Sequence, residues 1–338
     1  SSRRRHTRYS LQSRGLGDVY KRQAWTYWDN LKRVYGTDDE GYARRTFDNV
    51  GVQYGLRALK RQQISPQEFL RLNDEIGGWK PAADMQPERY WIYAAARSSL
   101  EEFSVWSAHN MYRKESPELP AKRSEGDIEA MQAAYRSGQV FLGKLDIPLI
   151  DFRNYLEPEL DMHHSKQSFS ARLRMLRYQG NANTQLIWFT RQPNLPIGDA
   201  IDLLDRWLGN MLANPGMSAV AAKPDDAKDR CYSANVGIIA SGDDVWDGAW
   251  NNRDNGECMN AYPIYSNPRI EAGDDYIGDV FKCHLQSIDA AIARGLYAPV
   301  DMAPHRGELL RIFPDGVCDY SRGDVALPPD LLPGGAVD

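Results

Sequence analysis

The chain has 338 residues, of which 42% are hydrophobic and 11% aromatic, and a formal net charge of −5. This length and apolar content suffice for one large folded domain or for two. No run of 18 apolar residues occurs, so the sequence predicts no membrane-spanning helix.

The first 23 residues differ in composition from the rest. Residues 1–23 carry seven Lys and Arg against one Asp, a net charge of +6, and show no helical or strand periodicity. We interpret them as a disordered, linker-like segment that is not native to the fold; a basic nucleic-acid arm is the alternative. The remaining chain has a net charge of −11, which argues against nucleic acid as a partner.

The region from residue 24 to about 140 is predicted to be helical. Ser65, Pro66 and Glu68 form a capping box at the start of a helix that ends before Gly77. No strand pattern separates the predicted helices, which favours a helical insertion. The other segments predicted as helices are 24–36, 48–63, 89–111 and 127–137.

The middle of the chain alternates predicted strands with predicted helices. Apolar runs at 147–152 and 184–189 are typical of buried parallel strands, and helical patterns follow at 169–178 and 199–213. This β-α-β-α order is the unit of an α/β sheet. From residue 215 onward Gly, Pro, Asp and Asn dominate, which predicts a loop-rich tail.

All four cysteines lie in this tail. Cys231, Cys258, Cys283 and Cys318 form no CxxC motif, so a zinc ribbon is not expected. Three disulfide pairings are possible, and we favour Cys231–Cys258 with Cys283–Cys318 because each closes a short local loop. Disulfides predict a secreted or periplasmic protein; four free thiols in a cytoplasmic protein are the alternative.

The groups best suited to chemistry follow the first predicted strand. This strand delivers Asp151 and Arg153 to its carboxyl end, where open α/β sheets bind their ligands. The next loop carries Asp161, His163 and His164, and a carboxylate beside an imidazole is what the general base of a nucleophile needs. We predict His163 as the base, His164 as the alternate base and Asp161 as the orienting acid, with Asp151 and Arg153 shaping the substrate site.

Simpler interpretations of these residues stay open. Adjacent histidines can cap a helix or face solvent, Asp161 and the two histidines could hold a metal, and Asp151 could pair with Arg153 or Arg172. The isolated His109, His284 and His305 favour structural or solvated positions. The acidic loop 243–257 could bind calcium, although it fits no EF-hand spacing, and its Trp246 and Trp250 favour packing near the disulfides.

Several motifs are absent from the 338 residues. The sequence contains no HExxH, no GxGxxG and no GxxxxGK[ST], and we predict neither a metal nor a cofactor. It also contains no GxSxG elbow, so a serine nucleophile of that type is missing from this chain.

Several longer segments of the sequence resemble a bacterial family known as domain of unknown function 6351. The resemblance runs from about residue 24 to 325 and implies an exported α/β-hydrolase roughly twice this length, with its serine in the N-terminal half. The family's Asp-Ile-His followed by an acid matches Asp161 and His163, but Met162 replaces the Ile and His164 stands where the acid often is. The words that carry the resemblance include RRTFDNVGVQYGLRAL (44–59), IPLIDFRNY (147–155), DMHHSKQSFSARLRM (161–175) and IFPDGVCDYS (312–321).

We therefore expect an α/β fold that forms the C-terminal half of an α/β-hydrolase. Its domain would span 24–214, with the helical insertion to about 140 and the last strands at about 147–214; the disulfide-bearing tail 215–338 would pack on it. The sheet should be incomplete, with an exposed apolar edge.

The expected function is that of a C-terminal fragment of a secreted serine-type hydrolase. Its substrate would be a small or polymeric ester or related acyl compound, and the fragment would be inactive without the missing N-terminal half. The alternatives are a degenerate hydrolase fold that binds a ligand or glycan, and a calcium-stabilised structural domain.

Overall fold

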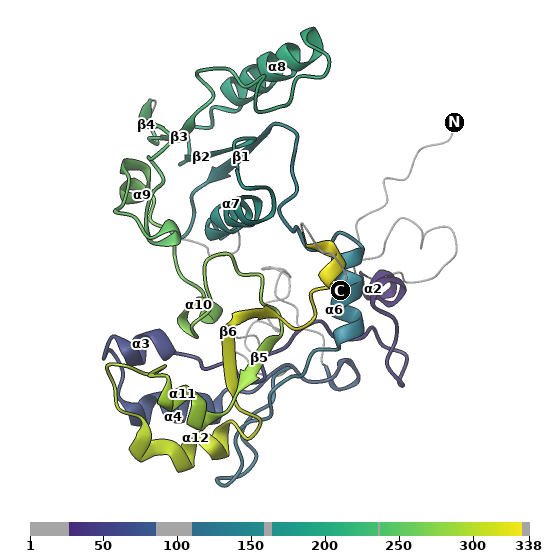
Figure 1. Ribbon diagram of the computed structural model, residues 1–338, viewed down its shortest axis with the longest axis vertical. Coiled ribbons are helices and arrows are strands. Elements are labelled where there is room, and N and C mark those ends of the chain that lie inside the picture. The colour runs from purple at the N-terminus through teal and green to yellow at the C-terminus, as the bar shows by residue number, and fades with distance from the viewer. Residues whose placement is uncertain (1–26, 86–109, 159–163, 236, 333–338) are drawn as a thin grey trace, which may run out of the picture. The chain divides into compact units, whose positions relative to one another are not determined.

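The computed structural model describes residues 27–85, 110–158, 164–235 and 237–332 (Figure 1). This part of the chain forms two compact units. Unit 1 combines the described residues up to Val140 with Val280–Pro328, and unit 2 contains Phe141–Asp279 together with the segment from Pro329. The helix expected at 89–111 falls almost wholly outside the described residues.

Unit 2 is built on a four-stranded mixed sheet with the order β1-β2-β3-β4. The strands are β1 (Leu149–Asn154), β2 (Gln185–Thr190), β3 (Asp229–Tyr232) and β4 (Ile238–Gly242). β1 and β2 are parallel, β2 and β3 are parallel, and β3 and β4 are antiparallel. Both predicted strands are present, and the sheet with its helices confirms the α/β class.

Two helices cover opposite faces of this sheet (Figure 1). Side chains alternate between the faces of a strand, and every residue of β2 is buried. Ile187 and Phe189 pack against Phe169 of α7 (Lys166–Gln179). Leu186 and Trp188 pack on the other side against α8 (Ile197–Ala213). The alternation of β2 therefore fixes a helix on each side of the sheet.

β1 is an edge strand of the sheet within the described residues. Parallel strands are ordinarily covered on both sides, and β2 is fully buried. In contrast, Ile147 just before β1 is 60% exposed and Leu149 at its start is 38% exposed. Within the described residues, the sheet thus has exposed apolar residues at the start of its edge strand, as the family resemblance implies. β1 itself is only half-buried, not buried as its apolar sequence predicts, because no described strand pairs with its outer side.

Unit 1 joins helices from the first third of the chain to elements of the tail. Leu59 and Phe69 share one buried cluster with Leu309, Phe313 and Val317, although about 250 residues separate the two sets. Burying a side chain of this size stabilises the fold by roughly 1.5–3 kcal/mol. The elements are α2 (Tyr27–Tyr35), α3 (Leu56–Lys60), α4 (Pro66–Glu75), η1 (Ala82–Asp84), α6 (Ile128–Arg136), β5 (Cys283–Gln286), α11 (Ile288–Ala293), η5 (Ala303–His305), α12 (Arg306–Ile312) and β6 (Val317–Asp324).

Local capping signals place two of these helices correctly. Ser65 Oγ accepts a hydrogen bond from the Glu68 main-chain N at 3.2 Å, and Ser65 N donates to Glu68 Oε2 at 2.8 Å. Asp127 caps α6 by accepting from Ala130 N at 2.9 Å. These bonds satisfy amide groups that the first turn of a helix leaves without partners.

The single helix predicted over 48–63 is wrong. Only Leu56–Lys60 is helical, and turns precede it. Gly51 and Gly55 both have positive φ, of 73° and 79°, which lies outside the right-handed helical region. The apolar spacing of this segment instead reflects burial of Val52, Leu56 and Leu59.

The tail holds more regular structure than its composition predicts. Besides β3 and β4, unit 2 contains η4 (Ala249–Asn251), α9 (Glu257–Ala261) and α10 (Pro268–Glu271). In unit 1, β5 and β6 form an antiparallel pair. The strands are only four to eight residues long, too short for their alternation to stand out from the surrounding Gly, Pro and Asp.

The structure contains two disulfides, Cys231–Cys258 and Cys283–Cys318. The first joins β3 to α9 within unit 2, and the second joins β5 to β6 within unit 1. Trp246 and Trp250 are buried in the cluster that surrounds the first disulfide, so they serve packing there.

Candidate functional site

Asp151 and Arg153 form an ion pair on β1. They lie on the same side of the strand, because residues two apart point the same way. Arg153 Nε donates to Asp151 Oδ1 at 3.0 Å and to Ser168 Oγ of α7 at 2.5 Å. The two side chains are only 18% and 24% exposed. No described residue bonds to the terminal nitrogens of Arg153, which leaves two N–H-bearing groups for an anionic or carbonyl oxygen.

Glu157 fixes the connection from β1 to α7. Its side chain is buried, and Oε1 accepts a hydrogen bond from the main-chain N of Ser165 at 2.5 Å. Ser165 precedes α7 and makes no capping bond with its own side chain. A carboxylate at this position accepts a hydrogen bond from an amide that the helix leaves unpaired, and its negative charge is stabilised by the positive end of the helix dipole. Glu157 thus holds the start of α7 close to the end of β1.

His164 makes contacts through both ring nitrogens. Lys166 N donates to Nδ1 at 3.4 Å, and Nε2 lies 3.3 Å from the carbonyl oxygen of Ser266. In a neutral imidazole one nitrogen accepts and the other donates. Because Nδ1 accepts from the Lys166 amide, Nε2 is assigned as the N–H that donates to the carbonyl oxygen of Ser266. Both ring nitrogens of His164 therefore contact main-chain groups of the described residues.

Asp161 and His163 lie outside the described residues. Their predicted roles as orienting acid and base therefore stay predictions. Of the three isolated histidines, His284 lies in β5 and His305 ends η5, both in unit 1, and His109 is also outside the described residues.

Unit 2 contains a second pair of buried charged residues, which the spacing of residues in the sequence does not reveal. Lys166 and Asp274 are both buried and interact electrostatically. Burial lowers the pKa of Lys166 and raises the pKa of Asp274 to about 6. Ser170 Oγ donates to the carbonyl oxygen of Tyr276 at 2.6 Å and brings the same two segments together. More than 100 residues separate these partners, so no local pattern relates them.

Two carboxylates of the acidic loop 243–257 are paired with neighbouring groups. Asp243 pairs with Lys228 at 2.9 Å, and Asp247 pairs with Arg253 at 3.2 Å and accepts from Asn251 Nδ2 at 2.7 Å. The described residues contain no group of three or more His, Cys, Asp or Glu placed to hold a metal ion.

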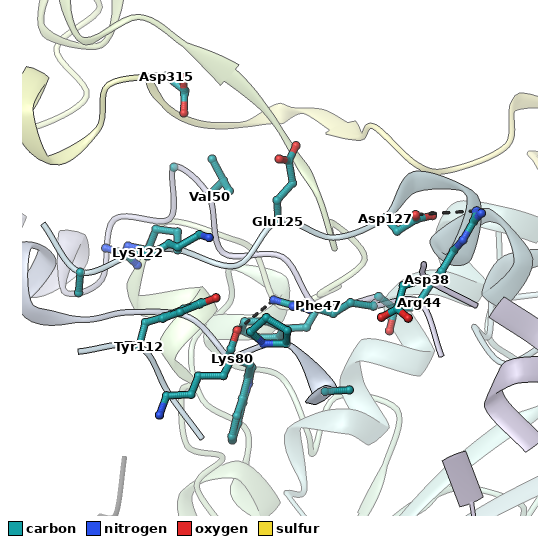
Figure 2. Close-up of a pocket in the computed structure, with 18 of the residues that line it drawn as sticks. Asp38, Arg44, Phe47, Val50, Lys80, Tyr112, Lys122, Glu125, Asp127 and Asp315 are labelled. Atoms are coloured by element: carbon teal, nitrogen blue, oxygen red, sulfur yellow. Dashed lines mark hydrogen bonds and ion pairs between the residues drawn. The ribbon is translucent and has the colours of Figure 1, made fainter. Parts of the chain in front are cut away.

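A cleft in unit 1 is the feature that sequence reasoning missed. It has a volume of about 1040 Å³ and is bordered by segments near residues 31–51, 79–85, 112, 120–127 and 312–316. Figure 2 shows charged and aromatic side chains from these segments around it. The contributing segments are far apart in sequence, and two of them, 112 and 120–127, contain no helix or strand, so no sequence motif predicts the cleft.

A family model matches residues 5–328, almost the whole chain. The chain belongs to the tannase-like family of unknown function, DUF6351. This match confirms the family that the sequence segments indicate. It begins at residue 5, so it includes most of the segment that we expected to be foreign to the fold. Comparisons with curated proteins and with solved structures found no match.

The Asp151–Arg153 ion pair and the cleft of unit 1 both lie within the part of this DUF6351 protein that the family model covers. In the described part of the chain, no helix combines the length and the apolar character needed to cross a membrane.

Proposed function

We propose that this chain supplies the acid and the base of a secreted or periplasmic serine-type acyl hydrolase that acts on esters. The observation that carries the proposal is the end of β1, where a parallel strand, a polar loop and the start of α7 meet. Ligands of open α/β sheets bind beyond the carboxyl ends of such strands. The family's description likens it to tannase, which is an esterase, and this agrees with the proposed reaction class.

In the proposed reaction, His163 takes the proton of a serine hydroxyl while the serine oxygen attacks the ester carbonyl carbon. The same imidazole returns that proton to the departing alcohol, which leaves an acyl-enzyme that water then hydrolyses. Asp161 orients the imidazole and stabilises its cation. The serine lies outside this chain, since the 338 residues contain no GxSxG elbow.

The described neighbours support His163 over His164 as the base. His164 uses Nδ1 and Nε2 on main-chain groups of Lys166 and Ser266, so its role in the proposal is to position the loop. Arg153 presents its terminal nitrogens beside Asp151 and is proposed to bind an oxygen of the substrate. Such preorganised donors stabilise negative charge that develops on the substrate.

Two further features support the wider architecture that the proposal needs. The exposed apolar edge of β1 suits a sheet that continues with further strands, as the C-terminal half of an α/β-hydrolase requires. Two disulfides suit an oxidising compartment, and therefore a secreted or periplasmic protein.

The test compares matched histidine variants in a protein that carries this chain together with an upstream half and its serine. His163→Ala should lower turnover of p-nitrophenyl esters by about 10⁴-fold, whereas His164→Ala should stay within about tenfold of the parent. Circular dichroism and urea unfolding establish that both variants are folded. Activity that survives His163→Ala would refute the assignment, and loss in His164→Ala alone would reverse it.

The isolated chain offers an independent test. A fluorophosphonate probe forms a covalent bond with an activated serine, and we expect no labelling of this chain alone. Labelling of a serine here would contradict the proposal that the nucleophile lies elsewhere. Binding of an ester analogue without turnover in the longer protein would instead favour the alternative of a degenerate, ligand-binding hydrolase fold.

A further inference from the structure

The cleft in unit 1 exposes aromatic surface. Phe47 and Trp79 are each 38% exposed, and their rings meet edge to face with centroids 6.3 Å apart. Tyr112 also lines the cleft, beside Lys122. Large aromatic side chains that remain exposed in a concave site offer ring faces and edges to a planar ligand.

The same cleft contains more cations than carboxylates that could neutralise them. Arg45, Lys80, Lys122 and Arg123 line it, and none has a carboxylate partner among the described residues. Arg45 donates to the carbonyl oxygen of Trp79 at 2.9 Å, and Lys122 Nζ lies 5.2 Å from the centre of the Tyr112 ring. Burial lowers the pKa of Arg123 to about 10, which is still well above neutrality, so Arg123 carries a positive charge at pH 7.

The carboxylates of the cleft offset this charge only in part. Glu125 pairs with Lys282 at 3.2 Å, and Asp127 lies 3.9 Å from Arg44. Asp38 accepts hydrogen bonds from amides of its own turn. Asp315 has no cation partner within the described residues. Figure 2 shows it on the opposite side of the cleft from Lys80 and Tyr112. The region around Phe47, Trp79 and Tyr112 is therefore both aromatic and positively charged.

We propose that this cleft binds a small aromatic carboxylate. The aromatic ring packs against Phe47 and Trp79, and the carboxylate is held by Lys122, with Lys80 and Arg45 contributing positive potential. A neutral aromatic compound leaves the cations uncompensated, and an aliphatic anion leaves the ring contacts unmade. This proposal is independent of acyl hydrolysis, because every residue that it uses lies in unit 1.

The experiment titrates the whole chain with 2-naphthoate by isothermal titration calorimetry. Two comparison compounds separate the contributions: 2-naphthylmethanol keeps the ring without the charge, and cyclohexanecarboxylate keeps the charge without the aromatic ring. We expect 2-naphthoate to bind about tenfold or more tightly than either compound. The affinity for 2-naphthoate should fall as the salt concentration rises from about 50 to about 500 mM, because salt shortens the Debye length and screens the attraction between the carboxylate and the cations.

Matched variants assign the binding to the cleft. Lys122→Met should weaken 2-naphthoate about fivefold or more and leave 2-naphthylmethanol within about twofold. Trp79→Leu should weaken both naphthyl compounds about tenfold. Lys122 is exposed and Trp79 is 38% exposed, so we expect both variants to fold, which urea unfolding checks. The controls are Lys60→Met, an exposed lysine outside the cleft, and Tyr265→Leu, an exposed aromatic residue of unit 2, and both should bind as the parent does.

Equal affinity for 2-naphthoate and 2-naphthylmethanol would overturn the proposal, because the cations would then contribute nothing. Unchanged 2-naphthoate binding in Lys122→Met or Trp79→Leu would also overturn it, as would equal losses in the two controls. Urea unfolding of each variant distinguishes a loss of binding from a loss of fold.

Discussion

Arg172 of α7 forms a doubly hydrogen-bonded ion pair with Asp229 of β3. Nη1 of Arg172 donates to Oδ2 at 2.5 Å, Nη2 donates to Oδ1 at 2.9 Å, and the side chains are only 11% and 6% exposed. Asp229 Oδ1 also accepts from Ile187 N of β2 at 2.8 Å. The pair therefore joins α7 to two strands and fixes the helix whose start borders the candidate site.

Removing one partner of this pair should be strongly destabilising. Asp229→Ala leaves the Arg172 guanidinium buried without its carboxylate, and we expect the free energy of unfolding to fall by about 3–5 kcal/mol. Urea unfolding measures the change. The matched control is Asp226→Ala, which removes a bidentate pair with Arg206 whose side chains are both 53% exposed, and it should change stability little. Similar losses in the two variants would contradict this account.

The disulfides should contribute comparable stability to their own units. Cys231–Cys258 spans 27 residues and Cys283–Cys318 spans 35, so loss of either should cost about 3–4 kcal/mol in the chain-entropy description. The double variants Cys231→Ala/Cys258→Ala and Cys283→Ala/Cys318→Ala test this by thermal unfolding under oxidising conditions. Dithiothreitol should lower the Tm of the parent and have less effect on each variant. A parent Tm that is insensitive to reduction would contradict the prediction.

Asp274 should make stability depend on pH in a defined window. Burial raises its pKa from 3.8 to about 6 in the folded protein, so between these values the folded state binds more protons than the unfolded chain. Stability from this group is therefore present at pH 4 and lost as pH rises through about 6, a change on the order of 2–3 kcal/mol.

The variant Asp274→Asn isolates that contribution from the other acids. Asn keeps an oxygen that can accept from Asp275 N, a bond of 2.8 Å in the parent, but it carries no charge. The stability of the variant relative to the parent should rise between pH 4 and pH 7, as measured by urea unfolding at each pH. A difference that stays constant across this range would show that Asp274 titrates normally.

Glu157 should stabilise the start of α7 through its charge and its hydrogen bond. Glu157→Gln keeps an acceptor for Ser165 N and should cost about 1 kcal/mol, while Glu157→Leu leaves that amide unpaired and should cost about 1–3 kcal/mol. Urea unfolding measures both changes. Glu115→Gln, at an exposed position of unit 1, is the control and should leave stability unchanged. Equal stability of Glu157→Leu and the parent would rule out this role.

Short-range signals in the sequence were sufficient for several elements. The capping box of Ser65 and Glu68, the Asp127 cap and the β1-α7-β2-α8 order depend on residues a few positions apart, so local periodicity predicts them. The two disulfides form the one pairing in which both loops are short and local, of 27 and 35 residues, and short loops close at the lowest cost in entropy.

At the candidate site, the pairing of Asp151 with Arg153 was among the interpretations that the sequence left open, and the sequence favoured His163 as the base with His164 as the alternate. His164 is distinguished by Ser266, more than 100 residues away, and that contact exists only in the folded chain. Asp161 and His163 stay predictions, since they lie outside the described residues.

Sequence by itself determined the α/β class, the family and the local order of strands and helices, because each follows from residue types at short spacing. Tertiary structure alone decided that Cys318 N donates to Gly51 O at 2.9 Å, and that Leu285 packs where a Gly51 side chain would lie. It also decided which cations of the unit 1 cleft have no carboxylate partner among the residues that the structure describes. These contacts join segments separated by up to about 270 residues, and their closure depends on burial and charge pairing across the whole unit, which no local pattern records.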